Sequence, residues 1–529
     1  MTRRRQLSLR NAAIPAAIVL LAAVLRMWNM KYDAQNPFYD AAVRSMGISW
    51  HNFFFGAFDP GGTLAIDKPP VDLWLQVAST KVLGFTRTAL ALPEALGGTA
   101  AVAFLYAAVT RGFGRLAGGL AALALAVLPI SVLTSRSDTM DSLMSALLIA
   151  ALWSAIVAVQ SRRARWVLVS AALVGLAFDV KLAEALIPLP ALALLWWVAC
   201  RPGRRFATGA GAVAVLIVTA MAWAFTASLT PLRERPFPIG SRTGSIYKAI
   251  FVFNGIERLT ASGRNLAPVG FPSSPGAARL LKAAHPDYAS LIGVAILAAL
   301  ALGLVALAIW ARRREDPLRK ALRAPPPERA RFWILVALAV WLATTYVLFS
   351  FIGHLQPRYL EAMSPAVAAI VGIASAYLLG QMRSPRAAWL FAAALLAGGA
   401  FSAKASIDLI QQRVSDANPS GSGSQYSAYL RAYREGARYE TAANGPLSVA
   451  GLIMQDAQPV LVMRDVDGKL VSLSRLERLV REGAVRFMIL SDPCASGPHC
   501  SATTAWSVRN SVMVQPGLYR YATALRRRP

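Results

Sequence analysis

The sequence predicts an all-α polytopic membrane bundle followed by a small α/β domain. The first observation is bulk hydrophobicity: 56% of the 529 residues are hydrophobic, and the mean hydropathy is +0.46. The second is that apolar runs of about 20 residues, the length that crosses a bilayer, recur through the first 400 positions. The third is a change to a mixed polar composition near residue 406. We therefore predict a transmembrane domain at residues 1–405 and an extracytoplasmic α/β domain at residues 406–529.

The apolar runs and the arginines together predict about eleven transmembrane helices. Arginine clusters occupy every second connection, and the positive-inside rule assigns those connections to the cytoplasm. The N-terminus is therefore expected in the cytoplasm and the C-terminal domain outside, in a multi-pass protein of the cell membrane. The expected spans are Ala12–Trp28, Leu90–Val109, Leu116–Leu133, Leu143–Val159, two that flank Phe178–Glu184, Ala207–Leu229, and four that end near Arg312, Phe351, Gln381 and Ala403.

The net charge of +28 comes from short basic clusters between the spans. A nucleic-acid-binding protein would present a basic face on a soluble fold, so the bilayer is an expected partner and nucleic acid is not. The basic residues that precede the first apolar run resemble those of a signal peptide. No small-residue cleavage site follows this run, so we interpret it as a retained helix.

The segment from Asp33 to Gln76 is polar and lies between the first two spans. Its apolar residues at helical spacing are Tyr39, Val43, Met46 and Trp50. This spacing predicts an amphipathic helix that lies in the plane of the membrane interface. Pro69 and Pro70 suit the start of a second interfacial helix, because proline is favoured in the first turn.

Acidic and basic side chains gather in this first outer loop. We consider Asp33, Asp40 and Asp67 as catalytic carboxylates, and Lys68, Arg44 and Tyr39 as substrate-binding groups. Transfer of a sugar from a polyprenyl-phosphate carrier needs a carboxylate that accepts the proton of the acceptor hydroxyl. It also needs cations that stabilise the departing phosphate. The structural alternatives are an Asp40–Arg44 surface pair at i, i+4 and an Asp67 cap on the following helix.

Other outer turns contribute further substrate-binding candidates, which are Asp138, Asp141, Lys181, His354 and Arg358. The alternative role for Asp138 and Asp141 is to cap the helix that follows them, and for Lys181 it is to snorkel to the bilayer surface. His354 is also a metal candidate, so a divalent metal is left open as a cofactor. The sequence has no Gly-rich nucleotide cradle and no hydrolase elbow, which argues against a nucleotide-sugar donor held in a Rossmann-type domain.

The C-terminal domain is predicted from short apolar runs that are bounded by turn residues. The expected elements are a helix at Tyr426–Tyr439, strands at Leu447–Met454 and Pro459–Met463, a turn at Asp465–Gly468, a helix that a Ser474–Glu477 capping box starts, and a strand at Val485–Leu490. Cys494 and Cys500 are close enough in sequence to form a disulfide, and two independent thiols are the alternative.

The polar loops carry motifs that resemble those of a known family. These motifs are NPFYDAAVRSM, SWHNFFFGAFDPGGTLAIDKPPVDLWLQ, RSDTMDSLM, FDVKLAEALIPLP, RPFPIGSRTGS and FVFNGIERL. They are similar to those of bacterial glycosyltransferase family 39-like proteins. These proteins are relatives of the dolichyl-phosphate-mannose protein mannosyltransferases and of the lipid A aminoarabinose transferase.

The resemblance implies a GT-C fold, a polyprenyl-phosphate sugar donor and inverting transfer on the outer face. It also implies that Asp67 and Lys68 lie at the lipid phosphate, and it gives Asp141 the role of the aspartate in the family's second outer loop. Relatives have an Asp-Glu pair where this chain has Gln35 and Asn36. The base therefore remains open among Asp33, Asp40 and Asp67, and an inactive chain is the further alternative.

From these residues we predict a membrane glycosyltransferase that moves a mannose-like or other sugar from a polyprenyl phosphate to an extracytoplasmic acceptor. The acceptor class stays open among protein, lipid and envelope glycan. The competing function is a transporter or flippase for a lipid-linked substrate. Transporters place ionisable residues near mid-membrane, whereas the acids of this chain collect at the outer ends of the spans. A non-catalytic scaffold is a third alternative.

Overall fold

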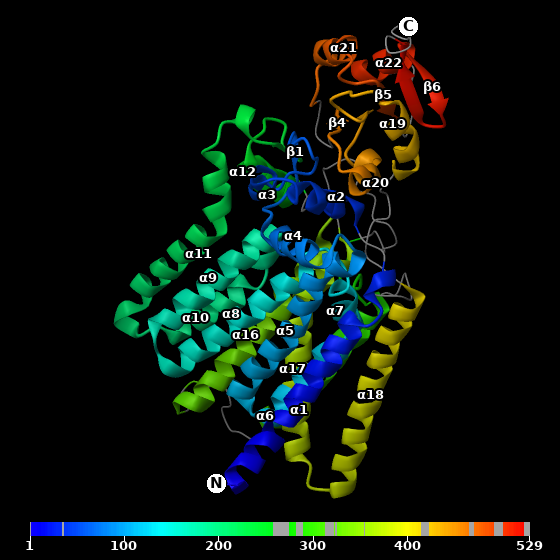
Figure 1. Cartoon of the computed structure of the whole chain (residues 1–529). Coiled ribbons are helices and arrows are strands. Elements are labelled where there is room, and N and C mark those ends of the chain that lie inside the picture. The colour runs from blue at the N-terminus through cyan, green and yellow to red at the C-terminus, as the bar shows by residue number, and fades with distance from the viewer. Residues whose placement is uncertain are drawn as a thin grey trace. The chain divides into compact units, whose positions relative to one another are not determined.

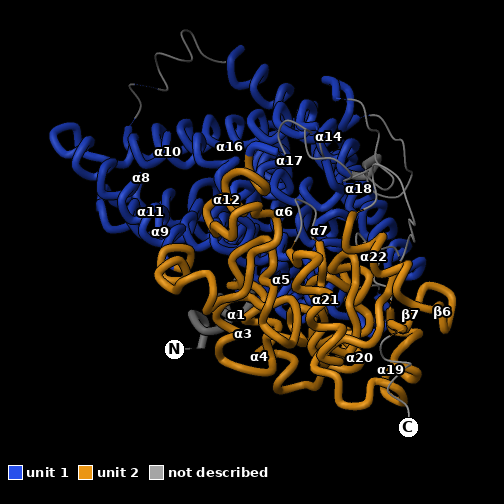
Figure 2. The backbone as a smooth tube through the Cα atoms, turned by 90° about the horizontal axis from the view of Figure 1, so that it is seen from above, with its two compact units in different colours: residues 1–34, 91–222, 256–416 blue, residues 35–90, 223–255, 417–529 orange. Residues whose placement is uncertain are grey.

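The computed structural model describes ten segments of the chain. These are residues 2–33, 36–257, 275–281, 289–312, 322, 325–353, 355–413, 423–464, 470–490 and 501–522. The chain forms two compact units, which Figure 2 colours separately. The helical unit contains residues 1–34, 91–222 and 256–416, and the mixed unit contains residues 35–90, 223–255 and 417–529.

Within the described residues, nine helices are long and apolar enough to cross a membrane. A spanning segment must satisfy its own backbone hydrogen bonds because lipid offers no partners, and a helix does so. Figure 1 shows these helices as the dominant elements of the chain. They are α1 (Thr2–Met27), α5 (Arg87–Phe113), α8 (Asp141–Ser161), α9 (Ala164–Lys181), α11 (Arg205–Ser228), α14 (Ala289–Arg312), α16 (Pro326–Phe351), α17 (Ser364–Gln381) and α18 (Pro385–Gln412).

Two of the expected spans form shorter helices, α6 (Arg115–Val127) and α10 (Leu189–Ala199). Proline shortens both, because it lacks the N–H that continues a helix and favours the first turn of a new one. Pro129 starts α7 (Pro129–Thr134) after α6, and Pro188 lies at the N-terminal boundary of α10. The nine long and two short helices confirm the predicted all-α membrane bundle.

The helices of the helical unit pack in close pairs: α8 packs against α9 and α10, and α17 packs against α6. A Cβ atom at Gly372 of α17 would lie 2.3 Å from the backbone nitrogen of Ala121 in α6. Glycine therefore permits this close approach, as small residues do between membrane helices.

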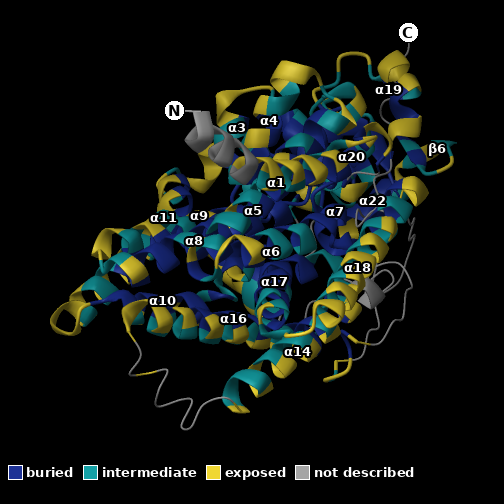
Figure 3. Cartoon of the chain, turned by 90° about the horizontal axis from the view of Figure 1, so that it is seen from below, coloured by how far each residue is buried: buried dark blue, intermediate teal, exposed yellow. Residues whose placement is uncertain are grey.

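Helix α18 is far less covered by the rest of the protein. Only 6% of its most apolar 18-residue stretch is buried, and Figure 3 shows exposed residues along this helix. The predicted domain boundary at residues 405 and 406 falls within α18.

The helices predicted in the first outer loop are present in the mixed unit. They are α2 (Pro37–Met46), α3 (Trp50–Phe55) and α4 (Val71–Leu83). The side chains of Asn36 and Ser49 cap α2 and α3, so Trp50 begins a separate helix rather than extending α2. The N-cap of α4 is Pro70, whose own side chain makes no capping hydrogen bond.

The loop after α11 pairs with the first outer loop. Strand β1 (Leu64–Ala65) runs parallel to β2 (Phe237–Pro238), and a π-helix, η5 (Ala249–Ile256), follows the single turn α12 (Ile246–Lys248). Gly240 has φ +80°, and a Cβ atom there would lie 2.4 Å from the Phe253 ring. The remaining short 3-10 turns are η1 (Met30–Tyr32), η2 (Leu182–Leu186), η3 (Pro202–Arg204), η4 (Leu232–Glu234), η6 (Pro357–Met363) and η7 (Ser424–Tyr426).

The C-terminal part of the mixed unit contains a five-stranded mixed sheet in the order β4-β3-β5-β7-β6. β3, β4 and β5 are parallel, whereas β7 is antiparallel to both β5 and β6. The strands are β3 (Ala442–Ala443), β4 (Leu461–Val462), β5 (Phe487–Ile489), β6 (Ser511–Gln515) and β7 (Leu518–Tyr521). The helices are α19 (Ser427–Tyr433), α20 (Leu447–Asp456), α21 (Leu473–Arg481) and α22 (Ala502–Arg509). Helix α20 packs against α2, so the first outer loop and this region share one unit.

The structure corrects three details of this region. Leu447–Met454 is part of helix α20 and not a strand, because its buried residues follow helical spacing, as Val449, Leu452 and Ile453 show. Ser472 rather than Ser474 caps α21. The expected helix at Tyr426–Tyr439 ends at Tyr433. The turn at Asp465–Gly468 and both late cysteines lie outside the described residues.

Candidate active site

Lys68 forms the centre of a polar cluster in the mixed unit. Its Nζ lies 2.7 Å from Oδ2 of Asp67 and donates a hydrogen bond to the Tyr39 hydroxyl at 2.9 Å. Nζ also lies 5.4 Å from the centre of the Tyr39 ring. The Lys68 side chain is 12% exposed and that of Asp67 is 7% exposed. This arrangement holds the ammonium between the Asp67 carboxylate and the Tyr39 hydroxyl and leaves a small part of the Lys68 side chain exposed.

Local structure fixes the backbone that carries this cluster. Asp67 and Lys68 lie between β1 and the prolines that precede α4. The side-chain amide of Asn254, in the π-helix η5, donates to the Asp67 carbonyl at 2.6 Å. π-Helical turns occur frequently at functional sites. Asn254 lies in the motif FVFNGIERL, but no role for it was predicted from the sequence, because the contact joins positions 187 residues apart.

Asp40 and Arg44 lie on α2 together with Tyr39. The Asp40 side chain is fully buried. The Arg44 guanidinium lies over the Phe85 ring, 5.1 Å from its centre. Arg44 is therefore placed by an aromatic contact within the mixed unit.

Asp59 organises the turn that leads into β1, and it is not among the candidates predicted from the sequence. Its Oδ1 accepts hydrogen bonds from the backbone N–H groups of Thr63 at 2.9 Å and Leu64 at 2.7 Å, and from the Thr63 hydroxyl at 3.0 Å. Burial raises the pKa of Asp59 to about 6, although the hydrogen bonds oppose this rise. The available signal was the Asp-Pro-Gly-Gly turn sequence at residues 59–62.

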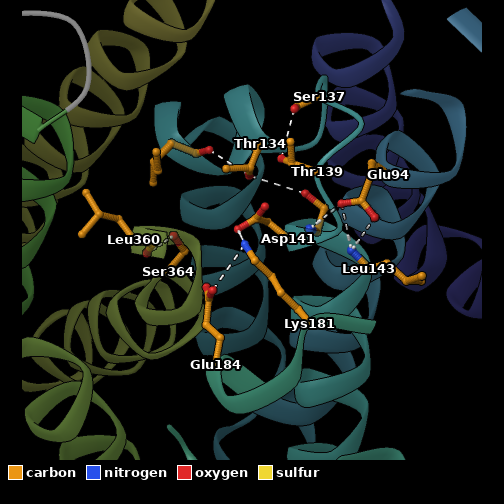
Figure 4. Close-up of polar contacts among 12 residues, drawn as sticks. Glu94, Thr134, Ser137, Thr139, Asp141, Leu143, Lys181, Glu184, Leu360 and Ser364 are labelled. Carbon is orange, nitrogen blue, oxygen red and sulfur yellow. Dashed lines mark hydrogen bonds and ion pairs between the residues drawn. The ribbon is translucent and has the colours of Figure 1, made fainter. Parts of the chain in front are cut away.

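A second polar cluster lies in the helical unit, at the start of α8 and the end of α9. Lys181 pairs with Asp141 and with Glu184, whose Oε2 lies 3.3 Å away, and its Nζ lies 5.2 Å from the centre of the Tyr359 ring. Figure 4 shows the Lys181 side chain between the two carboxylates. Lys181 is 6% exposed and Asp141 is buried. Lys181 therefore binds two acids and does not snorkel to the bilayer surface.

Tyr359 also contacts Arg358, whose guanidinium carbon lies 6.0 Å from the centre of the ring. Two predicted substrate-binding cations, Lys181 and Arg358, therefore share one aromatic ring. His354, which precedes this turn, lies outside the described residues.

Asp33 belongs to the helical unit, whereas Asp40 and Asp67 belong to the mixed unit. The Arg136 guanidinium lies 2.8 Å from Oδ2 of Asp33. Arg136 also donates to the carbonyls of Leu25 and Trp28, at the end of α1. Asp33 thus forms a buried ion pair with a residue that holds a helix terminus.

Glu94 of α5 is not among the predicted candidates, although it is an acid within an apolar span, where ionisable residues are functional candidates. Its carboxylate accepts hydrogen bonds from the backbone N–H groups of Ser142 at 2.7 Å and Leu143 at 3.3 Å (Figure 4). Glu94 therefore caps α8, which is the role considered above for Asp138 and Asp141. Asp138 is buried in the turn that precedes α8.

A buried network in the same unit was missed as well. Arg26 of α1 donates to the hydroxyls of Ser131 at 3.0 Å and Ser135 at 3.1 Å, and the Ser131 hydroxyl donates to Glu361 at 3.2 Å. Arg26 and Glu361 are both fully buried. Among the described residues, no group of three or more His, Cys, Asp and Glu side chains is placed to hold a metal ion.

Two family models match the chain. Residues 67–225 match the model described as dolichyl-phosphate-mannose-protein mannosyltransferase. Residues 426–510 match the C-terminal domain of YkcB-like candidate mannosyltransferases. YycA of Bacillus subtilis (strain 168), which is named as a candidate mannosyltransferase, is 35% identical over 253 residues. This match covers 47% of the chain and 37% of YycA, so the chain spans little more than a third of that relative's length.

Solved structures share the fold over nearly the whole chain. ArnT from Cupriavidus metallidurans bound to undecaprenyl phosphate has a TM-score of 0.58 at 15% identity, covering 96% of this chain and 97% of ArnT. The oligosaccharyltransferase AglB from Archaeoglobus fulgidus, in complex with an inhibitory peptide and a dolichol-phosphate, has a TM-score of 0.51 at 13% identity. That match covers 91% of this chain and 69% of AglB. The chain therefore has the GT-C fold of multi-pass membrane glycosyltransferases, and its predicted resemblance to the mannosyltransferase family is confirmed.

Proposed function

We propose that the chain transfers a sugar from a polyprenyl phosphate to an extracytoplasmic acceptor, with inversion at the anomeric carbon. The observation that carries this proposal is the Lys68–Asp67–Tyr39 cluster in the polar segment between α1 and α5. A partly accessible ammonium can bind a phosphate, and the carboxylate beside it can accept a proton. The structures of ArnT with undecaprenyl phosphate and of AglB with a dolichol-phosphate support a lipid-linked donor for this fold.

In the proposed step, the acceptor oxygen forms a bond to the anomeric carbon while the bond from that carbon to the phosphate oxygen breaks. A carboxylate accepts the proton of the acceptor, and the polyprenyl phosphate leaves with the bonding electron pair. Lys68 stabilises the negative charge that develops on the phosphate, and such a contact contributes on the order of 100-fold or more to the rate. Asp67 is the proposed base because it lies beside Lys68. Asp40 in the mixed unit and Asp33 in the helical unit are the other candidates.

Lys181 and Arg358, the two basic residues beside the Tyr359 ring, are proposed to bind the substrate in the helical unit. Lys181 is oriented by Asp141 and Glu184, and Arg358 offers a planar donor suited to phosphate or carboxylate oxygens. These groups lie at the ends of α8 and α9 and in η6, rather than at mid-span. Such end positions fit a reaction at the membrane surface better than a path through the bilayer.

The proposal is tested with Lys68→Ala and Asp67→Asn in membranes that receive polyprenyl-phosphate mannose with a labelled sugar. Both variants should lose roughly 100-fold or more of the transfer into an acid-stable product. Lys81→Ala, which removes an exposed lysine from the end of α4, is the matched control and should keep full activity. A flippase would move the label across the membrane but leave it acid-labile. Full transfer by both variants at normal protein levels would overturn the assignment.

A further inference from the structure

A basic cavity lies in the helical unit at the end of α8 opposite to Asp141. Its volume is about 420 Å³, and residues near the ends of α5, α8, α10 and α16 line it. α8 has 21 residues, which at a rise of about 1.5 Å each span roughly 30 Å, the thickness of a bilayer core. The cavity and the Asp141–Lys181 cluster therefore lie at opposite membrane faces.

Four arginines line this cavity, which are Arg111, Arg162, Arg329 and Arg331. None of them forms an ion pair with a carboxylate in the part of the chain that the structure describes. Arg162 donates to the Val198 carbonyl at 2.6 Å, and Arg331 donates to the Gly112 carbonyl at 2.9 Å. These bonds hold two guanidinium groups in place without neutralising their positive charge.

The arginines also repel one another. The pKa of Arg162 is lowered from its ordinary value, first by burial and then by the positive charges of Arg329 and Arg205. An anion bound between these groups would relieve the repulsion and gain charge-assisted hydrogen bonds. A helix-capping role accounts for the carbonyl contacts, but it gives no reason for Arg111 and Arg329 to line the same cavity.

We propose that this cavity binds the phosphate group of an anionic ligand. Among phosphate sources an anionic phospholipid fits best, because the cavity opens at helix ends and Trp333 also lines it. Tryptophan is enriched at the headgroup level of bilayers, and basic pockets between transmembrane helices bind anionic headgroups. Free phosphate shares the same chemistry and is separated from lipid by experiment. The proposal does not depend on the transfer reaction proposed above.

The test compares the purified full chain with the double variant Arg162→Gln/Arg329→Gln. The matched control is Arg383→Gln/Arg386→Gln, which removes the same charge from two exposed arginines outside the cavity. Thermal unfolding is measured in detergent micelles with added phosphatidylglycerol, with added phosphatidylcholine, or with inorganic phosphate. Phosphatidylglycerol should raise the midpoint of the wild type and of the control more than phosphatidylcholine does. The cavity variant should need at least ten-fold more phosphatidylglycerol for the same shift.

A shift with inorganic phosphate alone, lost in the cavity variant, supports the same site with a free anion as its ligand. Equal shifts in both double variants, or no shift with either phosphate source, overturn the proposal. The wild type provides a test that does not depend on the folding of any variant. Its phosphatidylglycerol shift should shrink as salt rises from 50 to 500 mM, because screening weakens the contact, and a salt-independent shift overturns the proposal.

Discussion

At the residue scale, two oxygen-bearing groups orient the Lys68 ammonium, the Tyr39 hydroxyl and the Asp67 carboxylate. The Tyr39 oxygen accepts a hydrogen bond from Lys68 at 2.9 Å, while Asp67 holds the same ammonium from another side. An ammonium on a four-carbon stem is flexible, so two fixed partners restrict its position. Tyr39 comes from α2 and Lys68 follows β1, so the position of the cation depends on the packing of the mixed unit.

Tyr39→Phe should lower the transfer rate by roughly five-fold, because one net hydrogen bond is worth about 1 kcal/mol. The aromatic ring beneath Lys68 is kept, so the loss should be much smaller than that of Lys68→Ala. Initial rates with labelled polyprenyl-phosphate mannose measure both. A Tyr39→Phe defect as large as that of Lys68→Ala would contradict a positioning role for the hydroxyl.

Glu440 gives the C-terminal region a pH-dependent stability. Burial, followed by a hydrogen bond with Asp456 and then by the charge of Asp456, raises the pKa of Glu440 from 4.5 to about 8. Between about pH 4.5 and 8 the folded state therefore binds more protons than the unfolded state, and the free energy of unfolding falls as pH rises. Below pH 4.5 the stabilisation from the protonated group is fully present.

Glu440→Gln should remove this component, because a glutamine is neutral at every pH. The variant should gain stability relative to the wild type as the pH rises toward 8, measured by thermal unfolding of the purified chain from pH 5 to 9. Glu482→Gln, at an exposed carboxylate, is the control and should leave the pH profile unchanged. If the unfolding midpoints of the wild type and of Glu440→Gln changed with pH in the same way, the raised pKa of Glu440 would be refuted.

At the element scale, the distance between α6 and α17 is limited by Gly372. A Cβ atom there would meet the Ala121 backbone, which cannot move aside as a flexible side chain can. Gly380 lies on the same helix and has open space around its Cβ position. The two glycines thus separate the effect of packing from that of helix propensity.

Gly372→Ala should destabilise the chain by about 1–3 kcal/mol, the usual cost of forcing an extra group into a packed interface. Gly380→Ala should be neutral or slightly stabilising, because alanine favours the helix. Thermal unfolding in detergent compares the two variants. Equal thermal unfolding midpoints for the two variants would show that α6 and α17 can move apart without loss of stability.

Elements also show where local patterns mislead. The run Leu447–Met454 is apolar and short, and periodicity alone does not distinguish a strand from a buried helix at that length. Packing against α2 decides it, and that partner is about 400 positions earlier in the chain. In contrast, Pro129 acts locally: it lies inside the single span expected at Leu116–Leu133 and starts the separate helix α7 after α6.

At the scale of the whole molecule, the alternation of arginine-rich connections predicts the orientation of the chain. Replacement of Trp50, which is 84% exposed, by cysteine should give a site that an impermeant maleimide labels in intact cells. Arg163→Cys, in the connection between α8 and α9, should react only after the cells are permeabilised. The background carries Cys494→Ser and Cys500→Ser, while the buried Cys200 is kept. Labelling of both sites from outside would contradict the predicted orientation.

The sequence by itself determined the membrane helices and the candidate pair Asp67 and Lys68, because apolar length, arginine pattern and adjacency are local properties. Only the tertiary structure decided which charges meet. Asp141 and Lys181 are 40 residues apart, and Glu94 caps a helix 48 residues away. Asn254 and Asp67 are 187 residues apart. Such contacts depend on how helices and loops pack, and no local pattern of polarity encodes that packing.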